Sequence, residues 1–204
     1  GAVFDAQGKR EEWQLDEATC DCCQTDVALA AGGPVLVYRD RTEAEIRDIA
    51  VTRYREGAWT APARVHADEW KMPAGPVNGP AVAARNARVY VAWYTAAAGE
   101  PELRLAKSAD DGKSFSAPRQ IAQGTEVQGR VDLVATDTAV YVSWLTEDTQ
   151  TQRLWLARYP ADLAGAPEQI EVAQLARGRG TGFPRLAWRA GGVHVVWTDI
   201  VERR

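Results

Sequence analysis

A repeat of about fifty residues is the feature of this sequence that most restricts its fold. Four short runs of mostly β-branched residues each carry an aromatic residue near their end: "PVLVYRD", "VYVAWYT", "VYVSWLT" and "VHVVWTD". These aromatic residues are Tyr38, Trp93, Trp144 and Trp197, and they are 51 to 55 residues apart. A repeat of this period with several strands per unit is typical of a β-propeller or a similar array.

Each unit also repeats the order of its segments. A strand after Gly or Pro comes first and the aromatic strand second. An alternating strand such as "ELRLAKS" or "RLWLARY" is third, and a Gly turn with a short edge strand is last. Four strands per unit is the number that a propeller blade needs, and alternation indicates strands with two differently solvated faces. We therefore predict an all-β fold, a β-propeller of four-stranded antiparallel blades, without amphipathic helices.

The repeat also predicts where the blades begin and end. We expect residues 1–204 to form one propeller domain or part of one, with complete blades at 20–75, 76–127 and 128–180 and partial blades at 1–19 and 181–204. Because both ends stop inside a unit, the chain either closes a four-bladed ring or belongs to a larger one. We favour the larger ring, completed by a missing segment or by a partner chain.

Charge and hydropathy exclude some classes of partner. The net charge is −4, so nothing predicts binding to nucleic acid. No apolar run approaches the length of a membrane span, and no leader segment opens the chain. The composition is that of a soluble globular protein.

One turn motif carries a family resemblance. The stretch "SADDGKSF" fits S-x-D-x-G-x-[TS]-[WF] at Ser108, Asp110, Gly112, Ser114 and Phe115. Such a turn needs a carboxylate that accepts amide hydrogen bonds, a glycine at positive φ and an aromatic residue that packs between sheets. It resembles the Asp-box, or bacterial neuraminidase repeat, of sialidases and related propellers. The resemblance implies a six-bladed sialidase-like ring, of which about four blades are covered here, and a structural Asp110 on the rim away from the active site.

The chain also resembles, more broadly, exported bacterial sialidase-like propellers with a CxCC motif and no assigned function. The resembling stretches are "TCDCCQTD", "VYRDR…EIRDI", "VHADEW", "PVNGPA", "GRVD" and "GFPR". The resemblance implies a periplasmic or secreted protein. It also implies a cysteine just before "PVNGP", where this chain has Gly75. If the family pairs that cysteine with the CxCC cluster, this chain cannot.

All three cysteines lie within four positions, and they leave three interpretations open. Cys20, Cys22 and Cys23 could bind copper or zinc as thiolates, with His66 as a fourth ligand. They could instead form a disulfide, between Cys20 and Cys23 or between Cys22 and Cys23, as suits an oxidising compartment. One of them could also be a reactive thiol activated by a nearby base.

In a propeller the first strand of each blade is innermost, and the segments that lead into these strands meet at one mouth of the central channel. We therefore expect a ligand site there, with these candidate residues: Thr25, Asp26, Arg39, Asp40, Arg47, Asp48, Trp70, Asn78, Arg130, Asp132, Phe183 and Arg185. Trp93, Trp144 and Trp197 follow the blade period and are expected in the core. Trp70 breaks the period and is expected as an exposed aromatic platform.

Three functions remain open at the sequence level. The first is an exported propeller that binds a small molecule, a glycan or a metal at the channel mouth around the CxCC cluster, without catalysis. The second is an exo-sialidase, a glycoside hydrolase. The resemblance implies that such an enzyme would use three arginines, a Tyr–Glu nucleophile pair and an Asp acid. The sialidase R-I-P motif is absent and no Tyr can be placed beside a Glu, so catalytic residues stay unassigned. The third is a protein-interaction scaffold.

Overall fold

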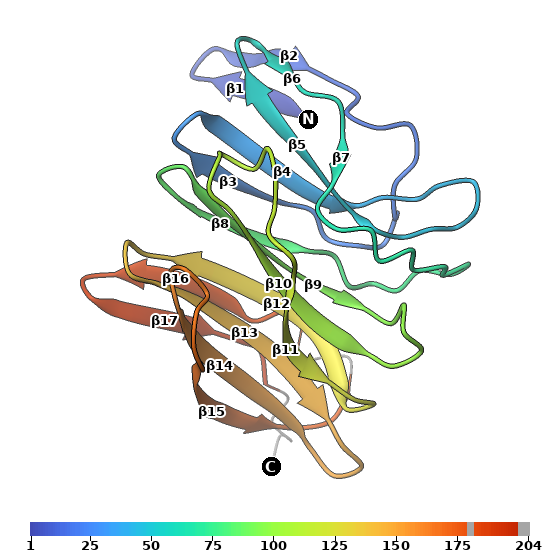
Figure 1. The fold of residues 1–204 in the computed structure, drawn as a ribbon, viewed down its shortest axis with the longest axis vertical. Helices are drawn as coiled ribbons and strands as arrows, with labels where there is room; N and C mark the ends of the chain where they lie inside the picture. The colour runs from blue at the N-terminus through green and yellow to red at the C-terminus, as the bar shows by residue number, and fades with distance from the viewer. Residues whose placement is uncertain (179–181, 200–204) are drawn as a thin grey trace.

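The computed structural model describes residues 1–178 and 182–199, and all regular structure in these ranges is β-strand. The strands form a row of antiparallel sheets, each built from consecutive strands of the chain (Figure 1). No helix in the described ranges could span a membrane. The all-β prediction is therefore confirmed.

Three sheets are complete blades in the predicted order. The first contains β3 (Asp26–Ala30), β4 (Gly33–Arg39), β5 (Ile49–Arg55), β6 (Ala58–Trp59) and β7 (Ala63–Arg64). The second contains β8 (Ala81–Arg85), β9 (Arg88–Thr95), β10 (Glu102–Ser108) and β11 (Arg119–Gln123). The third contains β12 (Val127–Ala135), β13 (Ala139–Glu147), β14 (Gln152–Pro160) and β15 (Glu168–Leu175). The outer edge of the first blade is split into β6 and β7 around Pro62, which has no backbone N–H to donate to a ladder.

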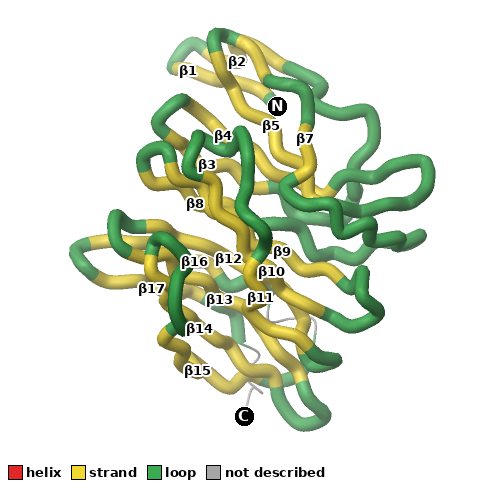
Figure 2. The backbone as a smooth tube through the Cα atoms, viewed as in Figure 1, coloured by secondary structure: helices red, strands yellow, loops and turns green. Residues whose placement is uncertain are grey.

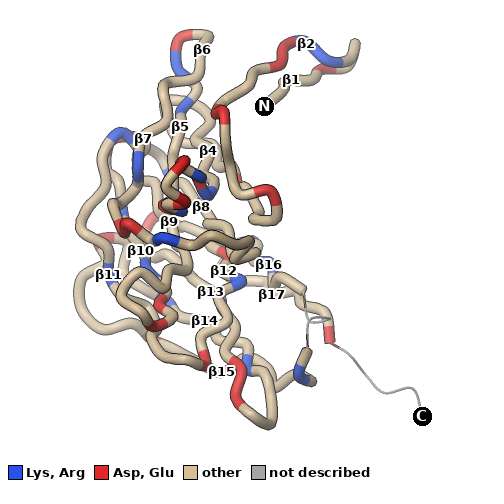
Figure 3. The backbone as a smooth tube through the Cα atoms, turned by 90° about the vertical axis from the view of Figure 1, so that its right-hand side faces the viewer, with Lys and Arg blue, Asp and Glu red and all other residues tan. Residues whose placement is uncertain are grey.

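Each end of the described chain forms a two-stranded sheet. These hairpins are β1 (Ala2–Asp5) with β2 (Gly8–Glu12), and β16 (Arg185–Arg189) with β17 (Gly192–Val196). In Figure 3 the β1–β2 hairpin projects from one end of the row, apart from the four-stranded sheets. The same view shows acidic and basic residues interspersed along the backbone rather than gathered by sign.

The core lies between neighbouring blades, as the periodic aromatic residues predict. Trp93 and Trp144 are fully buried, and each packs in an apolar cluster made by two adjacent sheets. Tyr38 is also buried. The prediction is wrong for Trp197, which is 38% exposed after β17, where the described chain places no third strand to cover it.

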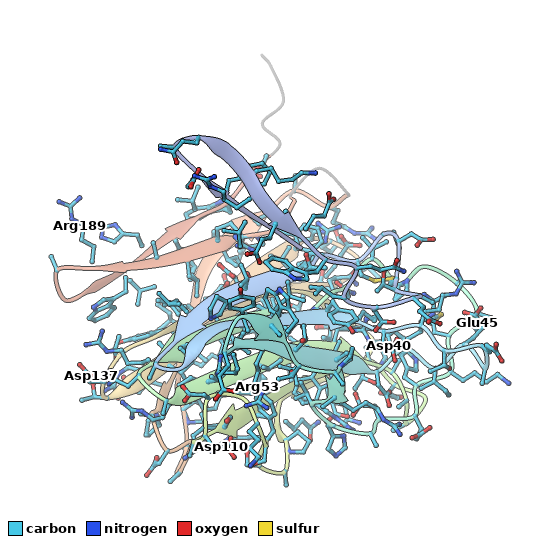
Figure 4. The ribbon with its side chains drawn as sticks, turned by 90° about the horizontal axis from the view of Figure 1, so that it is seen from above. Asp40, Glu45, Arg53, Asp110, Asp137 and Arg189 are labelled. Atoms are coloured by element: carbon cyan, nitrogen blue, oxygen red, sulfur yellow. A yellow bond between two sulfur atoms is a disulfide. The ribbon has the colours of Figure 1, made fainter. Side chains whose placement is uncertain are left out.

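The first strands of consecutive blades lie side by side. β3 contacts β8, β8 contacts β12, and β12 contacts β16. The long segments outside strands gather at one side of the molecule (Figure 2). Figure 4 places Asp40 and Glu45 on that side and Asp137 and Arg189 on the opposite side. The segments that lead into the first strands therefore share one rim, which we call the lead-in rim.

The Asp-box turn lies on the opposite rim. The Asp110 carboxylate accepts hydrogen bonds from the Ser114 amide (2.9 Å), the Ser114 hydroxyl (2.6 Å) and the Ser108 hydroxyl (2.7 Å). Gly112 has φ +79°, and Phe115 packs against the core between the first two blades. The next residue, Asp111, bonds through its amide to the carbonyl of Ala87 in the β8–β9 turn, far from the lead-in rim. These contacts are the ones that a structural role for Asp110 requires.

Candidate functional site

The cysteine cluster is a tight turn attached to the end of β4. The amide of Cys20 donates to the carbonyl of Arg39 at 2.9 Å, and Thr19 forms an isolated bridge with Asp40. The structure joins Cys20 and Cys23 by a disulfide and leaves Cys22 as a free, exposed thiol. The cluster therefore adopts one of the two disulfides that the sequence left open.

The three sulfur atoms nevertheless stay together. All lie within 4.8 Å of one another, and they are the one group of possible metal ligands found among the described residues. His66, the expected fourth ligand, is not in this group, and its Nδ1 lies 2.7 Å from a carboxylate oxygen of Asp68. A metal at this site would need the disulfide reduced and ligands other than His66.

A pocket of about 290 Å³ opens beside Cys22. It is bordered by the following residues of three segments: Cys20, Asp21, Cys22, Arg41, Arg47, Pro73, Ala74 and Gly75. Arg41 and Arg47 both pair with Glu45, at 2.8 and 2.7 Å. The carboxylate of Glu45 thus offsets much of the positive charge of the two arginines beside the pocket.

A second pocket, of about 360 Å³, lies on the lead-in rim and joins three consecutive blades. We call it the channel-mouth pocket, and its lining residues are Pro76, Val77, Asn78, Gln128, Arg130, Gly182 and Phe183. The guanidinium of Arg130 lies 5.7 Å from the centre of the Phe183 ring and donates to the carbonyl of Gly182 at 3.1 Å. The stack holds a cation and an aromatic face together at the pocket wall.

Asn78 holds this pocket together. Its side-chain amide donates to the carbonyl of Gln128 at 3.1 Å, and its side-chain oxygen accepts the amide of Arg130 at 3.2 Å. Gly129 has φ +76°, and a Cβ there would lie 2.7 Å from the Asn78 oxygen, so only glycine fits. The backbone of Val77 and Arg130 is also left-handed, at φ 63° and 54°. Left-handed backbone also occurs at seven other described non-glycine residues, so here it shapes the pocket without marking it as functional.

Two of the predicted acidic residues bind backbone rather than open solvent. Asp26 accepts the amide of Val82 at 2.8 Å, and Asp132 accepts the amide of Leu186 at 2.6 Å. Each carboxylate therefore ties its own first strand to the first strand of the next blade. Arg185 lies 3.5 Å from Asp132 and is more exposed.

Burial is the largest influence on both carboxyl groups. It raises the pKa of Asp26 and of Asp132 above their usual value, while the amide hydrogen bonds and the charge of Arg185 oppose it. Asp26 also raises the pKa of Asp132 through charge repulsion, so the two acids influence each other across the first strands. The hydrogen bonds of these two acids hold neighbouring blades together. Of the three charged groups, Arg185 is the most exposed to solvent.

Four predicted ligand residues are buried in the wall behind the site. Arg39 is 1% exposed, and its guanidinium donates to the carbonyls of Asn78, Arg47 and Tyr94. Trp70 is 4% exposed and packs under Arg39, whose Cζ lies 4.9 Å from the ring centre. The prediction of an exposed Trp70 platform is therefore wrong.

The other two buried residues of this group are Arg47 and Asp48. Arg47 donates to the carbonyl of Met72 at 3.2 Å, and Asp48 accepts the amides of Glu69 and Trp70, both at 3.2 Å. The charged side chains of this segment pair locally. They pair inward because the carbonyls and amides of residues 69–72 and 78 need partners away from water.

The last two candidates lie apart from the channel-mouth pocket. The Asp40 carboxylate accepts the amide of Arg41 at 2.7 Å, and burial raises the pKa of Asp40. Thr25 borders a separate pocket of about 250 Å³ under the N-terminal segment, with Leu36 and Tyr38. Only Asn78, Arg130 and Phe183 of the predicted ligand residues line the channel-mouth pocket.

The sequence did not single out two residues of this region, Asp68 and Gln128. Asp68 is buried and binds His66, the Trp93 indole (2.7 Å) and Arg104 (2.6 Å), which links two blades. Gln128 sits one position before the quoted "GRVD" stretch, so widening that stretch would have found it. Asp68 lies within the quoted "VHADEW" stretch, but nothing in that stretch distinguishes it from other loop acids.

Comparison with known proteins identifies the fold. No protein-family model matches the chain, and no curated protein matches it. Among solved structures, Trypanosoma rangeli sialidase in complex with 2,3-difluoro-KDN matches with TM-score 0.57 and 11% identity, covering 97% of this chain and 36% of that chain. A second T. rangeli sialidase structure matches with TM-score 0.55 and 11% identity, covering 97% of this chain and 37% of that chain. A NanB sialidase variant from Streptococcus pneumoniae matches with TM-score 0.50 and 11% identity, covering 85% of this chain and 27% of that chain.

The described sheets are therefore β-propeller blades of the sialidase type. At 11% identity the similarity establishes the fold and does not extend to activity. The chain spans about a third of the length of the T. rangeli sialidases that it matches.

Proposed function

We propose that this chain is part of an exported sialidase-like β-propeller that binds a small polar ligand, such as an acidic sugar, without hydrolysing it. The observation that carries the proposal is the channel-mouth pocket, which three consecutive blades build around the Arg130 guanidinium on the Phe183 ring. A fixed cation beside an aromatic face suits a ligand with both an anionic group and an apolar ring face.

A binding role is favoured over hydrolysis by where the acids and tyrosines lie. The carboxylates of Asp26 and Asp132 accept hydrogen bonds from backbone amides of the next blade. Tyr38 donates its hydroxyl to Asp16, and Tyr94 packs edge-on against Trp70. Neither tyrosine borders the channel-mouth pocket, where a nucleophile would be needed.

Export to the periplasm or outside the cell belongs to the same proposal. The Cys20–Cys23 disulfide supports it, because such bonds persist mainly in oxidising compartments. The short span relative to the sialidases supports further blades, from the same protein or a partner chain, that complete the ring.

Ligand-observed NMR with free sialic acid, an uncharged hexose and a hexuronic acid tests this proposal. We expect the acidic sugars to bind, with at least a tenfold weaker affinity in Arg130→Ala and in Phe183→Ala. Arg119→Ala is the matched control, because Arg119 stacks on Tyr159 at 5.0 Å away from this pocket. Equal binding by all variants, or no binding by any sugar, would overturn the proposal.

The same variants separate binding from hydrolysis. Release of fluorophore from a fluorogenic sialoside, lost in Arg130→Ala and kept in Arg119→Ala, would establish the glycoside hydrolase instead. Capture of a partner chain with no sugar binding would favour the scaffold.

A metal site at the cysteines is a second candidate, supported by the three sulfur atoms within 4.8 Å of one another. It requires reduced protein, so anaerobic protein treated with a phosphine should bind about one equivalent of zinc or copper(I). Untreated protein and the Cys22→Ser variant should bind less. Elemental analysis after gel filtration measures this, and equal metal in all samples would rule the site out.

A further inference from the structure

The indole N–H of Trp144 donates no hydrogen bond within residues 1–178 and 182–199, although its side chain is only 1% exposed. In these residues, the unpaired side-chain atoms that are sealed from solvent belong to Gln24, Trp59 and Ser143, so the Trp144 N–H reaches open space. That space is a pocket of about 310 Å³ between the second and third blades, which we call the inter-blade pocket. Buried donors are normally paired, so this N–H is left for a partner from outside the chain.

The inter-blade pocket has an aromatic wall and a polar border. Trp155 stacks on Trp144, with ring centres 6.4 Å apart and ring planes 20° apart. Its own N–H donates to the Thr146 hydroxyl at 2.9 Å, which fixes the orientation of the indole. The pocket is lined by Ile121, Ala122, Gln123, Glu126, Val127, Trp144, Thr146, Arg153, Trp155 and Gln169. None of these residues lines the channel-mouth pocket.

Trp144 occupies the same place in the third blade as Trp93 in the second. On the neighbouring strand, Trp93 is opposite Arg104 and Trp144 is opposite Trp155. The pairing of the third strand with the fourth shifts register directly before Arg104 and directly before Trp155. A register shift of this kind redirects side chains, and here it does so at equivalent positions. The spaces on the two sides of the second blade can therefore be compared residue by residue.

The protein itself fills the equivalent space between the first and second blades. The buried carboxylate of Asp68 accepts the Trp93 N–H at 2.7 Å and pairs with Arg104 at 2.6 Å. Asp68 belongs to the long segment 65–80, whereas only residues 124–126 link β11 to β12. The short link supplies no counterpart of Asp68, and the inter-blade pocket lies in its place.

We propose that the inter-blade pocket binds an uncharged pyranose sugar, one oxygen of which accepts the Trp144 N–H as Asp68 accepts that of Trp93. The C–H face of the sugar ring packs on the Trp155 indole. The side-chain amides of Gln123 and Gln169 offer hydrogen bonds to its hydroxyl groups. Because the pocket and the ligand charge both differ from those of the channel mouth, this site goes beyond the proposed function.

The charges around the inter-blade pocket favour an uncharged ligand over an anionic one. The guanidinium of Arg153 pairs with Asp148 at 2.5 Å and lies 3.5 Å from a carboxylate oxygen of Glu171. Glu126 adds an exposed acid to the border. The cation at this pocket is therefore already matched, and an anionic sugar would be repelled by the surrounding carboxylates.

Indole N–H resonances of the native, ¹⁵N-labelled chain test the proposal directly. The protein is titrated with N-acetylglucosamine and with methyl glucoside, and the tryptophan side chains are assigned by triple-resonance NMR. We expect the Trp144 resonance to shift with sugar concentration, because its N–H gains a new acceptor. The Trp93 resonance should stay in place, because Asp68 already holds that N–H.

Variants then locate the sugar. Trp144→Phe removes the donor and Trp155→Leu removes the aromatic face, so each should weaken sugar binding about fivefold, as the loss of one such contact does. Trp188→Phe is the matched control, because Trp188 stacks on Tyr141 outside this pocket. Arg130→Ala should also leave this binding unchanged, which separates a failure here from a failure of the channel-mouth proposal.

Two results would overturn the proposal. The first is an unmoved Trp144 resonance in folded wild-type protein at the highest soluble concentration of both sugars, which would leave water as the partner of this N–H whatever the variants do. The second is binding that is lost in Arg130→Ala and kept in Trp155→Leu, which would place the uncharged sugar in the channel-mouth pocket.

Discussion

At the scale of single residues, Asp110 shows how a short motif specifies one geometry. Its carboxylate accepts three hydrogen bonds from Ser108 and Ser114. These hydrogen bonds hold the pKa of Asp110 well below its usual value near 3.8, and the side-chain bonds from Ser114 and then Ser108 have the largest effect. A carboxyl group whose pKa is lower in the folded state stabilises the fold at pH values above its unfolded-state pKa. This stabilisation is lost as the pH falls toward and through the folded-state pKa.

The Asp110→Asn variant should therefore be less stable than wild type at neutral pH. We expect a loss of about 1 kcal/mol, small because the turn is exposed to solvent. The difference should shrink as the pH falls below about 4. Urea unfolding from pH 7 to pH 3 measures it, with Lys113→Ala in the same turn as control. A constant difference across this range would show that the charge of Asp110 is not the cause.

Arg39 shows a residue whose role comes from distant partners. Its three donor positions reach carbonyls of residues 47, 78 and 94, and its charge is balanced by Asp68 and Asp48. Burial lowers the pKa of Arg39 to about 10, so the group is still charged at neutral pH.

Arg39→Lys should destabilise the fold by about 2–4 kcal/mol, because an ammonium cannot serve the three carbonyls in the planar geometry of a guanidinium. Arg53→Lys, on β5 of the same blade and less buried, is the matched control and should change stability little. Denaturant midpoints compare the two. Equal effects would mean that the wall behind the site does not depend on Arg39.

At the scale of elements, the segment of residues 75–79 connects the two candidate sites. It has no strand of its own, and it packs against the cysteine turn and supplies Asn78 to the channel-mouth pocket. Gly79 allows the closest approach, because its Cα faces the backbone carbonyl of Gln24.

Gly79→Ala should destabilise the chain by about 1–3 kcal/mol, since the added methyl would lie 1.9 Å from a backbone atom that cannot rotate away. Gly192→Ala is the control, because its nearest atom would be 3.8 Å away. The thermal unfolding temperature and the affinity for acidic sugars should both fall in Gly79→Ala and stay unchanged in Gly192→Ala. Unchanged unfolding in Gly79→Ala would mean that the two segments can separate without cost.

At the scale of the whole molecule, the complete blades cover each other, whereas each end hairpin leaves apolar side chains exposed to solvent. Phe4 is 67% exposed on β1, and Val196 is 68% exposed on β17. Isolated two-stranded sheets are marginally stable in water, and exposed apolar faces favour association.

We therefore expect this chain to self-associate as its concentration rises. Phe4→Asp should weaken the association several-fold, whereas Ala6→Asp, which adds the same charge to the turn of the same hairpin, should not. Sedimentation velocity over a concentration series measures this. A monomer at every concentration would show that these faces need no cover.

The sequence alone determined the properties that depend on near neighbours. Alternation and the fifty-residue repeat predicted the four-stranded blades, and the Asp-box predicted a turn whose bonds all lie within seven residues. Buried Trp93 and Trp144 followed from the same period. Cysteine spacing limited the possible pairings but left the choice among them open.

Only the tertiary structure decided what distant segments do to one another. Trp70 is buried because Arg39, far from it in sequence, lies over its ring. His66 joins Asp68 instead of the cysteines, and Asp26 and Asp132 tie blades together instead of facing a ligand. Buried charges and backbone groups must find partners in three dimensions, and a local pattern does not contain those partners.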